Sequence, residues 1–420
     1  MTDNFASRYH SHYSSQYGNG IVGALVVNGP TSANWDIDLG PYLMTDYYYE
    51  TADNLQRHAE LLSGGPPDSD NVLFRGKNVN ANGTKGAYDR LTLTPGKRHL
   101  LRLINTSVDN SMTVSLVGHS FTVIGTDLVP VKPTVRTKLF MGVGQRYDVV
   151  IVADQKVDNY WFNVTMEASN LCGRSRNKFP ASIFHYDGAG SGNPTNKGTP
   201  LVADCVDETG FQPIVQRNLT SSSFASGSNQ LDVALSTPTV DFRGQVFRWL
   251  VNKTDLDIDW SHPTLEYVAN KSTKYPAQNN VVELPKANVW TYWIVQNGFV
   301  LPHPLHLHGH DFLILGTGSG TFNAATMTKN LNFINPVRRD VAQMPASGWI
   351  VIAFETNNPG CWLLHCHIAW HVSQGLAVQF IERKDDIMKL MKLDQMQPNC
   401  RAWRAWVPKA PYLPKLDSGL

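Results

Sequence analysis

This chain of 420 residues has little net charge, no long apolar run and few cysteines. The formal net charge at pH 7 is +1, which gives no reason to expect a nucleic acid or an anionic membrane as a partner. No apolar run reaches the roughly 18 residues of a membrane-spanning helix. Residues 1–9 also lack the charged and apolar regions of a signal peptide, so we expect a soluble chain that carries no export signal of its own.

Helical periodicity is scarce as well, and residues 382–392 form the clearest helix candidate. Short runs of alternating apolar and polar residues recur instead, for example at 91–94 and 148–152, separated by Gly, Pro, Asn and Asp. This pattern predicts an all-β fold of β-sandwich domains. At about 100 to 200 residues per domain, two or three domains are expected. The Gly-rich stretch 186–194 has the composition of a linker, and we expect a domain to end near residue 212.

What the chain does have is histidine, gathered in short clusters. One cluster, at residues 365–371, begins with His365, Cys366 and His367. Successive side chains of a β-strand point to opposite faces, so the two histidines share one face and Cys366 points to the other. One short strand can therefore serve two metal centres.

A second cluster, at residues 303–310, divides in the same way. His306 and His308 fall on one face of a strand, whereas His303, an odd number of residues earlier, points away from them. This segment too is predicted to contribute to two sites.

The types of ligand indicate which metal these clusters bind. One thiolate with two imidazoles, here Cys366 with His303 and His371, is the donor set of a blue-copper centre, and the remaining imidazoles suit copper or zinc. A structural zinc site would need Cys and His pairs in a closed tetrahedron, and a chain with 14 histidines but 5 cysteines does not favour one. Copper is therefore the predicted metal. Histidines that stand singly are predicted to be ordinary core or surface residues: His58, His99, His119, His185 and His262.

A third cluster consists of His10 and His12. Alone it is weak evidence, because two polar residues often share a strand face by chance. Together with the other clusters it resembles the multicopper oxidases, and most closely the fungal laccases of the ascomycete type. The resemblance extends from about Tyr9 to the last residue. It also includes segments 46–49, 94–99, 144–149, 335–340 and 417–420.

The resemblance implies a fold of tandem cupredoxin-like Greek-key β-sandwiches. Residues 1–30 would be the remnant of a first cupredoxin domain, and residues 31–212 would form a complete second domain. A complete third domain, at residues 213–420, would hold the type-1 copper site and the C-terminal tail.

The resemblance further implies four coppers in a complete enzyme, one of type 1, one of type 2 and two of type 3. The type-1 ligands would be His303, Cys366 and His371. The type-2 copper would be bound through His306. The type-3 pair would be bound by five further histidines: His10, His12, His308, His365 and His367.

The family carries four copper-ligand segments, and the first, of the form H-W-H-G, precedes the H-S-H segment. Only nine residues precede His10 in this chain, and none is histidine. We therefore expect an N-terminal truncation that removes one type-2 ligand and one type-3 ligand and leaves the type-1 site whole. Cys400 agrees with this expectation, because the resemblance implies a bridge from it to a cysteine in the missing part.

A laccase couples one-electron oxidation of phenolic substrates to four-electron reduction of dioxygen to water. The resemblance implies that electrons enter through His371, beside Trp370, and pass from Cys366 to the histidines next to it. Leu376 stands in place of an axial methionine. Loss of that weak ligand in an apolar shell should favour Cu(I) and raise the potential. The resemblance also implies a monomer that acts on small phenols, such as those derived from lignin.

Two further features have alternative interpretations. Asp109 aligns with an acidic residue of the laccase substrate pocket, where it could take the phenolic proton as a general base. The alternative is a loop aspartate that satisfies backbone donors. The tail, residues 417–420, resembles a segment that enters the channel to the copper cluster, and the alternative is a frayed terminus.

The cysteines and sequons favour export. Cys172 and Cys205 flank a Gly/Ser/Pro-rich stretch, and the resemblance implies a disulfide between them. Cys361 is expected to be a buried free thiol. The family is extracellular, so we expect a secreted glycoprotein. Six Asn-X-Ser/Thr sequons agree mildly with this, at Asn82, Asn105, Asn163, Asn218, Asn252 and Asn270.

Two alternatives to a phenol-oxidising laccase remain open at this stage. A ferroxidase-like oxidase of metal ions would need an acidic pocket near His371, and the neighbouring sequence has no local acidic cluster. A non-catalytic product would bind copper only at the type-1 site. It would also expose the surface that a first domain normally covers.

Overall fold

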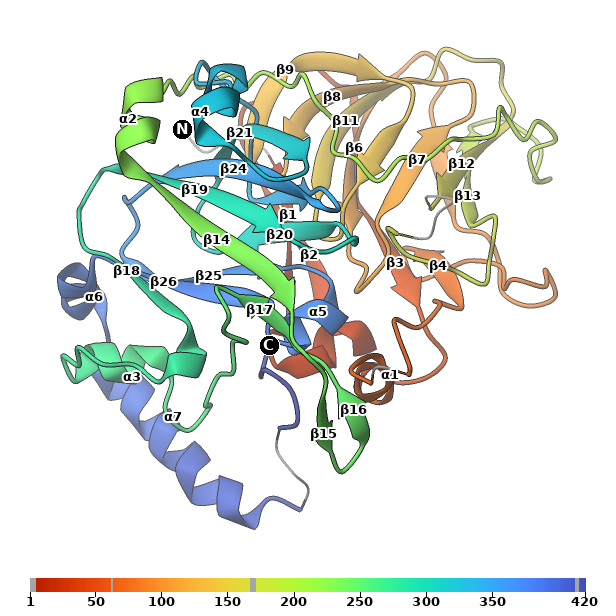
Figure 1. The fold of residues 1–420 in the computed structure, drawn as a ribbon. Helices are drawn as coiled ribbons and strands as arrows, with labels where there is room; N and C mark the ends of the chain where they lie inside the picture. The colour runs from red at the N-terminus through yellow and green to blue at the C-terminus, as the bar shows by residue number, and fades with distance from the viewer. Residues whose placement is uncertain (1–4, 62, 167–170, 412–414) are drawn as a thin grey trace.

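The computed structural model describes residues 5–61, 63–166, 171–411 and 415–420. Two β-sandwiches lie side by side, the first in orange and yellow and the second in green and blue (Figure 1). The prediction of an all-β fold built from sandwiches is confirmed.

The first sandwich pairs a six-stranded sheet with a five-stranded sheet. The six-stranded sheet has the order β4 (Asn71–Phe74), β3 (Ile37–Tyr47), β6 (Arg98–Asn105), β11 (Arg146–Val152), β8 (Phe121–Thr126) and β9 (Val129–Arg136). The five-stranded sheet has the order β10 (Leu139–Met141), β7 (Met112–Leu116), β12 (Asn159–Thr165), β13 (Ala181–Tyr186) and β5 (Arg90–Leu93).

Alternation of side chains builds the core of this sandwich. Leu101 and Leu103 of β6 and Val149 of β11 point between the two sheets into one large cluster. Leu100 and Val150, one residue away on the same strands, lie in a separate cluster on the other face. These strands are therefore buried on both faces, which explains their nearly continuous apolar runs.

The second sandwich has the same plan. Its six-stranded sheet has the order β17 (Trp249–Val251), β14 (Ser228–Leu235), β19 (Trp290–Asn297), β24 (Gly348–Glu355), β21 (Phe312–Ser319) and β22 (Arg338–Arg339). Its five-stranded sheet has the order β18 (Val281–Leu284), β26 (Ala377–Glu382), β25 (Gly360–Cys366), β20 (His303–Leu307) and β23 (Val341–Met344).

A separate hairpin joins the two sandwiches. Its strands β1 (Phe5–His10) and β2 (Val22–Val27) pair with each other in a two-stranded sheet. β1 contacts β6 and β11 of the first sandwich. At its end, the ring of His10 lies 5.4 Å from that of His367 in the second sandwich. The hairpin therefore contributes side chains to the junction of the two sandwiches.

The helices are short and lie outside the sheets, for example α1 (Ala52–Ala59) and α5 (Ala369–Ser373). The helix predicted at residues 382–392 is α6 (Lys384–Leu390), because Glu382 still belongs to β26. The longest helix, α7 (Leu393–Trp406), was not predicted, since it contains Pro398 and has weak apolar periodicity. Among the described residues, no helix is both long and apolar enough to span a membrane.

Candidate metal centres

The two histidine-rich strands pair with each other in the sheet. β20 and β25 are antiparallel neighbours in which Leu305 lies opposite Cys366 and His306 lies opposite His365. Directly opposed residues point to the same face of a sheet. The imidazoles of His306 and His365 therefore emerge on one face and the Cys366 thiol on the other.

The thiol face forms a compact set of three ligands. Cys366 Sγ lies 3.6 Å from Nδ1 of His303 and 3.6 Å from Nδ1 of His371, and the two Nδ1 atoms are 3.1 Å apart. All three residues are buried. α5 begins directly after the turn that follows β25 and so returns His371 to the thiol.

The chemistry of this thiol-face set fits a metal ion. Burial lowers the pKa of His371 to about 3, lowers that of His303 well below its usual value and raises that of the Cys366 thiol. Both imidazoles are therefore neutral and offer lone pairs, and the thiol needs a nearby cation in order to ionise. A single thiolate with two imidazoles suits copper.

Aromatic and aliphatic side chains enclose this set. Leu376 and Trp370 are buried, and the backbone N–H of Leu376 donates to the His371 carbonyl at 3.1 Å. The ring of Trp249 lies 4.7 Å from the rings of both His303 and His371. Sequence reasoning missed Trp249, because it comes from a distant strand, β17, and carries no local motif.

The opposite face holds a cluster of imidazoles. The ligand nitrogens of His12, His308 and His365 all lie within 4.8 Å of one another, and Nε2 of His308 is 3.0 Å from Nε2 of His365. Nε2 of His12 is buried without a hydrogen-bond partner. Burial lowers the pKa of His12 to about 4, so the ring is neutral and this lone pair is available to a metal.

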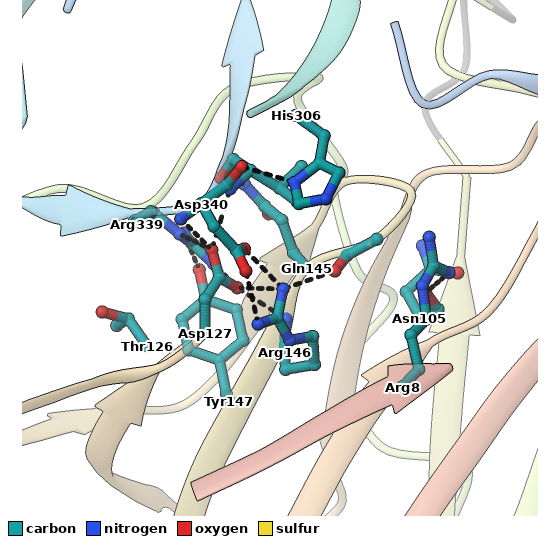
Figure 2. A network of polar contacts seen from close by, with 12 residues as sticks. Arg8, Asn105, Thr126, Asp127, Gln145, Arg146, Tyr147, His306, Arg339 and Asp340 are labelled. Atoms are coloured by element: carbon teal, nitrogen blue, oxygen red, sulfur yellow. Dashed lines mark hydrogen bonds and ion pairs between the residues drawn. The ribbon is translucent and has the colours of Figure 1, made fainter. Parts of the chain in front are cut away.

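His306 lies beside this cluster, held by a buried ionic network (Figure 2). Its ring is 4.9 Å from that of His308, and its Nδ1 donates to the Asp340 carbonyl at 2.7 Å. The Asp340 carboxylate accepts bonds from both Nη atoms of Arg146, at 2.5 and 2.8 Å. The network thus fixes the orientation of the imidazole and leaves Nε2 pointing away from Asp340. Segment 335–340 was noted in the sequence, but this role was not predicted.

His10 and His367 lie at the other end of the cluster. Burial, followed by the charge of Arg8, lowers the pKa of His10 to about 3. Nη2 of Arg8 lies 3.1 Å from Nδ1 of His367 and also contacts Nε2. A guanidinium carries only donors, so His367 does not offer a free lone pair as His12 does. Sequence reasoning did not single out Arg8.

His310, in the same segment as His303, lies outside both centres. Its Nε2 bonds Oε2 of Glu382 at 2.7 Å in a buried pair. This imidazole is satisfied by a carboxylate and is a core residue of the second sandwich.

Asp109 lies in a buried loop next to α5. The backbone N–H of Ala369 donates to the Val108 carbonyl at 2.8 Å, which ties this loop to the helix that carries His371. Burial, and then the negative charge of Asp46, raises the pKa of Asp109 to about 7. The carboxyl group is therefore partly protonated and partly ionised near neutral pH.

The backbone donors of this loop are bound by another carboxylate. Asp46 accepts the N–H groups of Val108 at 2.9 Å, Asp109 at 2.9 Å and Asn110 at 3.0 Å. Asp46 is thus the aspartate that satisfies the backbone donors of this loop, which is the structural role considered as the alternative for Asp109. Segment 46–49 is part of the family resemblance, but this role of Asp46 was not predicted from the sequence.

The C-terminal tail is buried against the imidazole cluster. Ser418 N–H donates to the Ser373 carbonyl at 2.7 Å, and its Oγ donates to the Val372 carbonyl at 2.7 Å. Leu420 lines a small cavity together with four cluster histidines, His10, His12, His365 and His367. The interpretation of a frayed terminus is therefore wrong, and the tail reaches the cluster as expected.

The cysteine predictions are largely met. Cys172 and Cys205 form a disulfide. Cys361 and Cys400 are free thiols, and Cys361 is half-buried where a fully buried side chain was expected.

Comparison with known proteins agrees with this geometry. Family models described as multicopper oxidase match residues 39–189 and 251–386. A laccase of Cryphonectria parasitica is 48% identical over 99% of this chain and 72% of its own length. The chain belongs to the multicopper oxidase family. As a multicopper oxidase of the laccase type it is an oxidoreductase, and copper is its cofactor.

Two further laccases lead to the same assignment, and a more distant structure shares the fold. Laccase-1 of Melanocarpus albomyces is 48% identical over 99% of this chain and 68% of its own length. The crystal structure of the laccase from Botrytis aclada has a TM-score of 0.89 at 34% identity and covers 99% of this chain and 77% of that one. Fet3p, a multicopper oxidase that functions in iron import, shares the fold, with a TM-score of 0.82 at 20% identity.

Proposed function

We propose that this laccase-type oxidase takes single electrons from phenolic substrates and uses them to reduce dioxygen to water. The observation that carries the proposal is the pair of centres on opposite faces of β25. Cys366 belongs to one centre and its covalent neighbour His365 to the other. A few backbone bonds therefore connect the thiol centre with the imidazole cluster.

The proposed copper ligands follow from the two centres. His303, Cys366 and His371 would hold the type-1 ion. The cluster would hold the remaining copper through His12, His308 and His365, with the imidazoles of His10 and His306 beside them. The sixth imidazole, His367, contacts Arg8. Bound copper supplies one-electron redox chemistry and a place for dioxygen, and the protein sets its position and potential.

Leu376 tunes the thiol centre in this proposal. Its side chain is buried and purely aliphatic, so it adds no donor atom to the three that the ligand set provides. The absence of a thioether donor in an apolar shell favours the reduced metal and a higher potential. Trp370 and Trp249 add to this shell and exclude water from the ligand rings.

Asp109 is the proposed base for the phenolic proton. A phenol that loses an electron becomes a strong acid, and a carboxylate beside it removes the need to form a radical cation. With its pKa raised to about 7, Asp109 is basic enough to take this proton and is still largely ionised above neutral pH. Asp46 holds the loop that presents it.

The same proposal covers the organisation of the chain. Residues 31–212 and 213–420 each form one domain, and the hairpin within residues 1–30 belongs to neither. Phe211 packs in the core of the first sandwich and Leu219 in the second, which supports a boundary near residue 212.

Secretion as a monomeric glycoprotein is proposed as well. The Cys172–Cys205 disulfide suits an oxidising compartment. Four sequon asparagines are exposed and open to glycosylation: Asn82, Asn218, Asn252 and Asn270. Asn105 is not open, because its buried amide donates to the carbonyls of Asn110, Met141 and Gly142.

Oxygen uptake by the copper-loaded chain tests the proposed function. With a phenol such as 2,6-dimethoxyphenol, we expect oxygen consumption in proportion to the phenol oxidised. Cys366→Ser keeps a side chain of similar size but removes the thiolate, and it should abolish the activity. A copper-loaded wild-type chain that consumes no oxygen with any phenol would overturn the proposal.

A further inference from the structure

Arg8 distinguishes His367 from the other imidazoles of the cluster. It projects from β1, and its Nη1 donates to the Asn105 carbonyl at 2.9 Å (Figure 2). Its Nη2 lies against the edge of the His367 ring and contacts both nitrogens, with 3.1 Å to Nδ1. A neutral imidazole has one lone pair on its ring nitrogens, and whichever nitrogen bears it in His367 faces a guanidinium that is protonated at neutral pH and has only donors.

Three other imidazoles of the cluster keep a ring nitrogen for a metal. Nε2 of His12 is buried and unpartnered, and Nε2 of His308 faces Nε2 of His365. These three form a group whose ligand atoms lie within 4.8 Å of one another, and among the described residues His10, His306 and His367 lie outside it. A metal ion beside His367 would compete with Arg8 for the same lone pair and would meet its positive charge.

The surroundings hold Arg8 in this place. The Asn105 side chain is fixed by three donated hydrogen bonds, so the carbonyl that Arg8 uses is fixed as well. Gly144 leaves room on the other side, since a Cβ there would come within 2.7 Å of the His367 ring and 3.1 Å of Arg8 Nη2. The negative charges of Asp340 and Asp127 act on Arg8, but these carboxylates are bound by Arg146 and Arg339.

We infer that Arg8 withholds His367 from copper. The chain then takes up metal at the set of His303, Cys366 and His371 and at the set of His12, His308 and His365, while the place beside His367 stays closed. This inference rests on the proposed copper-binding function and adds that a cation of the hairpin limits the loading of the cluster. Arg8 acts through His367 and is a positioning residue.

Deletion of one imidazole at a time tests the inference on the intact chain. His367→Ala and His365→Ala remove buried imidazoles two residues apart, so each is the matched control for the other. After copper loading and desalting, elemental analysis should give the wild-type copper content for His367→Ala and about one copper fewer per chain for His365→Ala. A loss of about one copper from His367→Ala as well would overturn the role of Arg8. No loss from either variant would overturn the proposed imidazole site itself.

Substitution of Arg8 gives an independent test by metal content and copper spectroscopy. Arg8→Gln removes the charge and keeps a donor for the Asn105 carbonyl, whereas Arg8→Lys keeps the charge. We expect Arg8→Gln to gain about one copper per chain and Arg8→Lys to gain none, with an added Cu(II) paramagnetic signal in Arg8→Gln alone. The double variant Arg8→Gln/His367→Ala should lose the gain. A folded Arg8→Gln chain with wild-type copper content would contradict the inference.

Discussion

Two buried carboxylates, Asp46 and Asp109, determine the acid–base chemistry of the loop next to the thiol centre. Asp46 and Asp109 lie in one loop environment, and each raises the pKa of a nearby acid or phenol through its negative charge. Burial raises the pKa of Asp46, and the three backbone N–H groups that it accepts oppose this shift. Asp109 lies beside that carboxylate, and burial and the Asp46 charge together keep it partly protonated near pH 7. Two neighbouring carboxylates thus have different roles because their hydrogen bonds differ.

Replacement of Asp109 tests its role as the base. Asp109→Asn should lower kcat/KM for a phenol by roughly 100-fold. Oxidation of ferrocyanide, which loses an electron but no proton, should change little. Equal losses of rate with the phenol and with ferrocyanide would show that the substitution damages the copper site. This result would contradict proton removal by Asp109.

The pH profile provides a second test at this scale. Because only ionised Asp109 accepts a proton, the phenol oxidation rate should rise with pH through about 7. Asp46→Asn keeps an oxygen acceptor for the loop but removes the negative charge, so the pKa of Asp109 should fall. The acid limb of kcat/KM against pH should then shift to lower pH, and an unshifted limb would contradict the coupling.

At the scale of elements, a buried ionic network connects the sandwiches at His306. Arg146 of β11 pairs with Asp340, which precedes β23, and Arg339 of β22 pairs with Asp127, which follows β8. Burial alone would raise the pKa of Asp127, but Arg339 and Arg146 hold it below its usual range. These ion pairs join the two sandwiches next to His306.

Removal of one charge from this network should be costly. Arg146→Ala leaves the Asp340 carboxylate buried without its main partner, and the free energy of unfolding should fall by about 3–5 kcal/mol. Urea unfolding measures this change, with Arg338→Ala, a less buried arginine next to Arg339, as the control. A loss below about 1 kcal/mol would contradict the assignment.

The same network predicts how stability responds to acid. The folded-state pKa of Asp127 is depressed, so its stabilisation is present above the pKa of the unfolded chain and is lost as pH falls below about 4. Urea midpoints should therefore decline from pH 5 to pH 3, and Asp127→Asn should decline less steeply. A parallel decline would show that other carboxylates account for the acid response.

At the scale of the whole molecule, the cluster is assembled from distant parts of the chain. His12 lies in the connection between the two strands of the N-terminal hairpin, and His308 and His365 belong to the second sandwich. Leu420 lines a cavity together with His12 and His365. A metal bound there would link the hairpin to the second sandwich, so binding would stabilise contacts that the apo chain makes only through packing.

Amide hydrogen exchange should detect this link. Copper loading should slow exchange in residues 5–27 by about tenfold or more relative to the apo chain. His12→Ala should lose this protection but keep any protection around Cys366, which belongs to the other centre. Equal protection of the hairpin in His12→Ala would contradict a metal link through this residue.

Much of both centres was predictable, because strand alternation and ligand chemistry are local properties. Parity alone separated Cys366 from His365 and His367, and donor types indicated copper before any fold was known. The helix at residues 393–406 escaped prediction, since its propensity signal is weak and Pro398 lies within it. Trp249 and Asp46 escaped because their importance comes from contacts across the fold.

The sequence by itself determined the all-β class, the donor atoms and their division between two faces, because each follows from the order of side chains along a strand. Only the tertiary structure decided which imidazoles retain a free nitrogen. Arg8 reaches His367, Glu382 binds His310 and the Asp340 carbonyl orients His306 through contacts between segments far apart in the chain. Burial and charge at a site depend on all the elements that pack around it, so they cannot be predicted from a local sequence pattern.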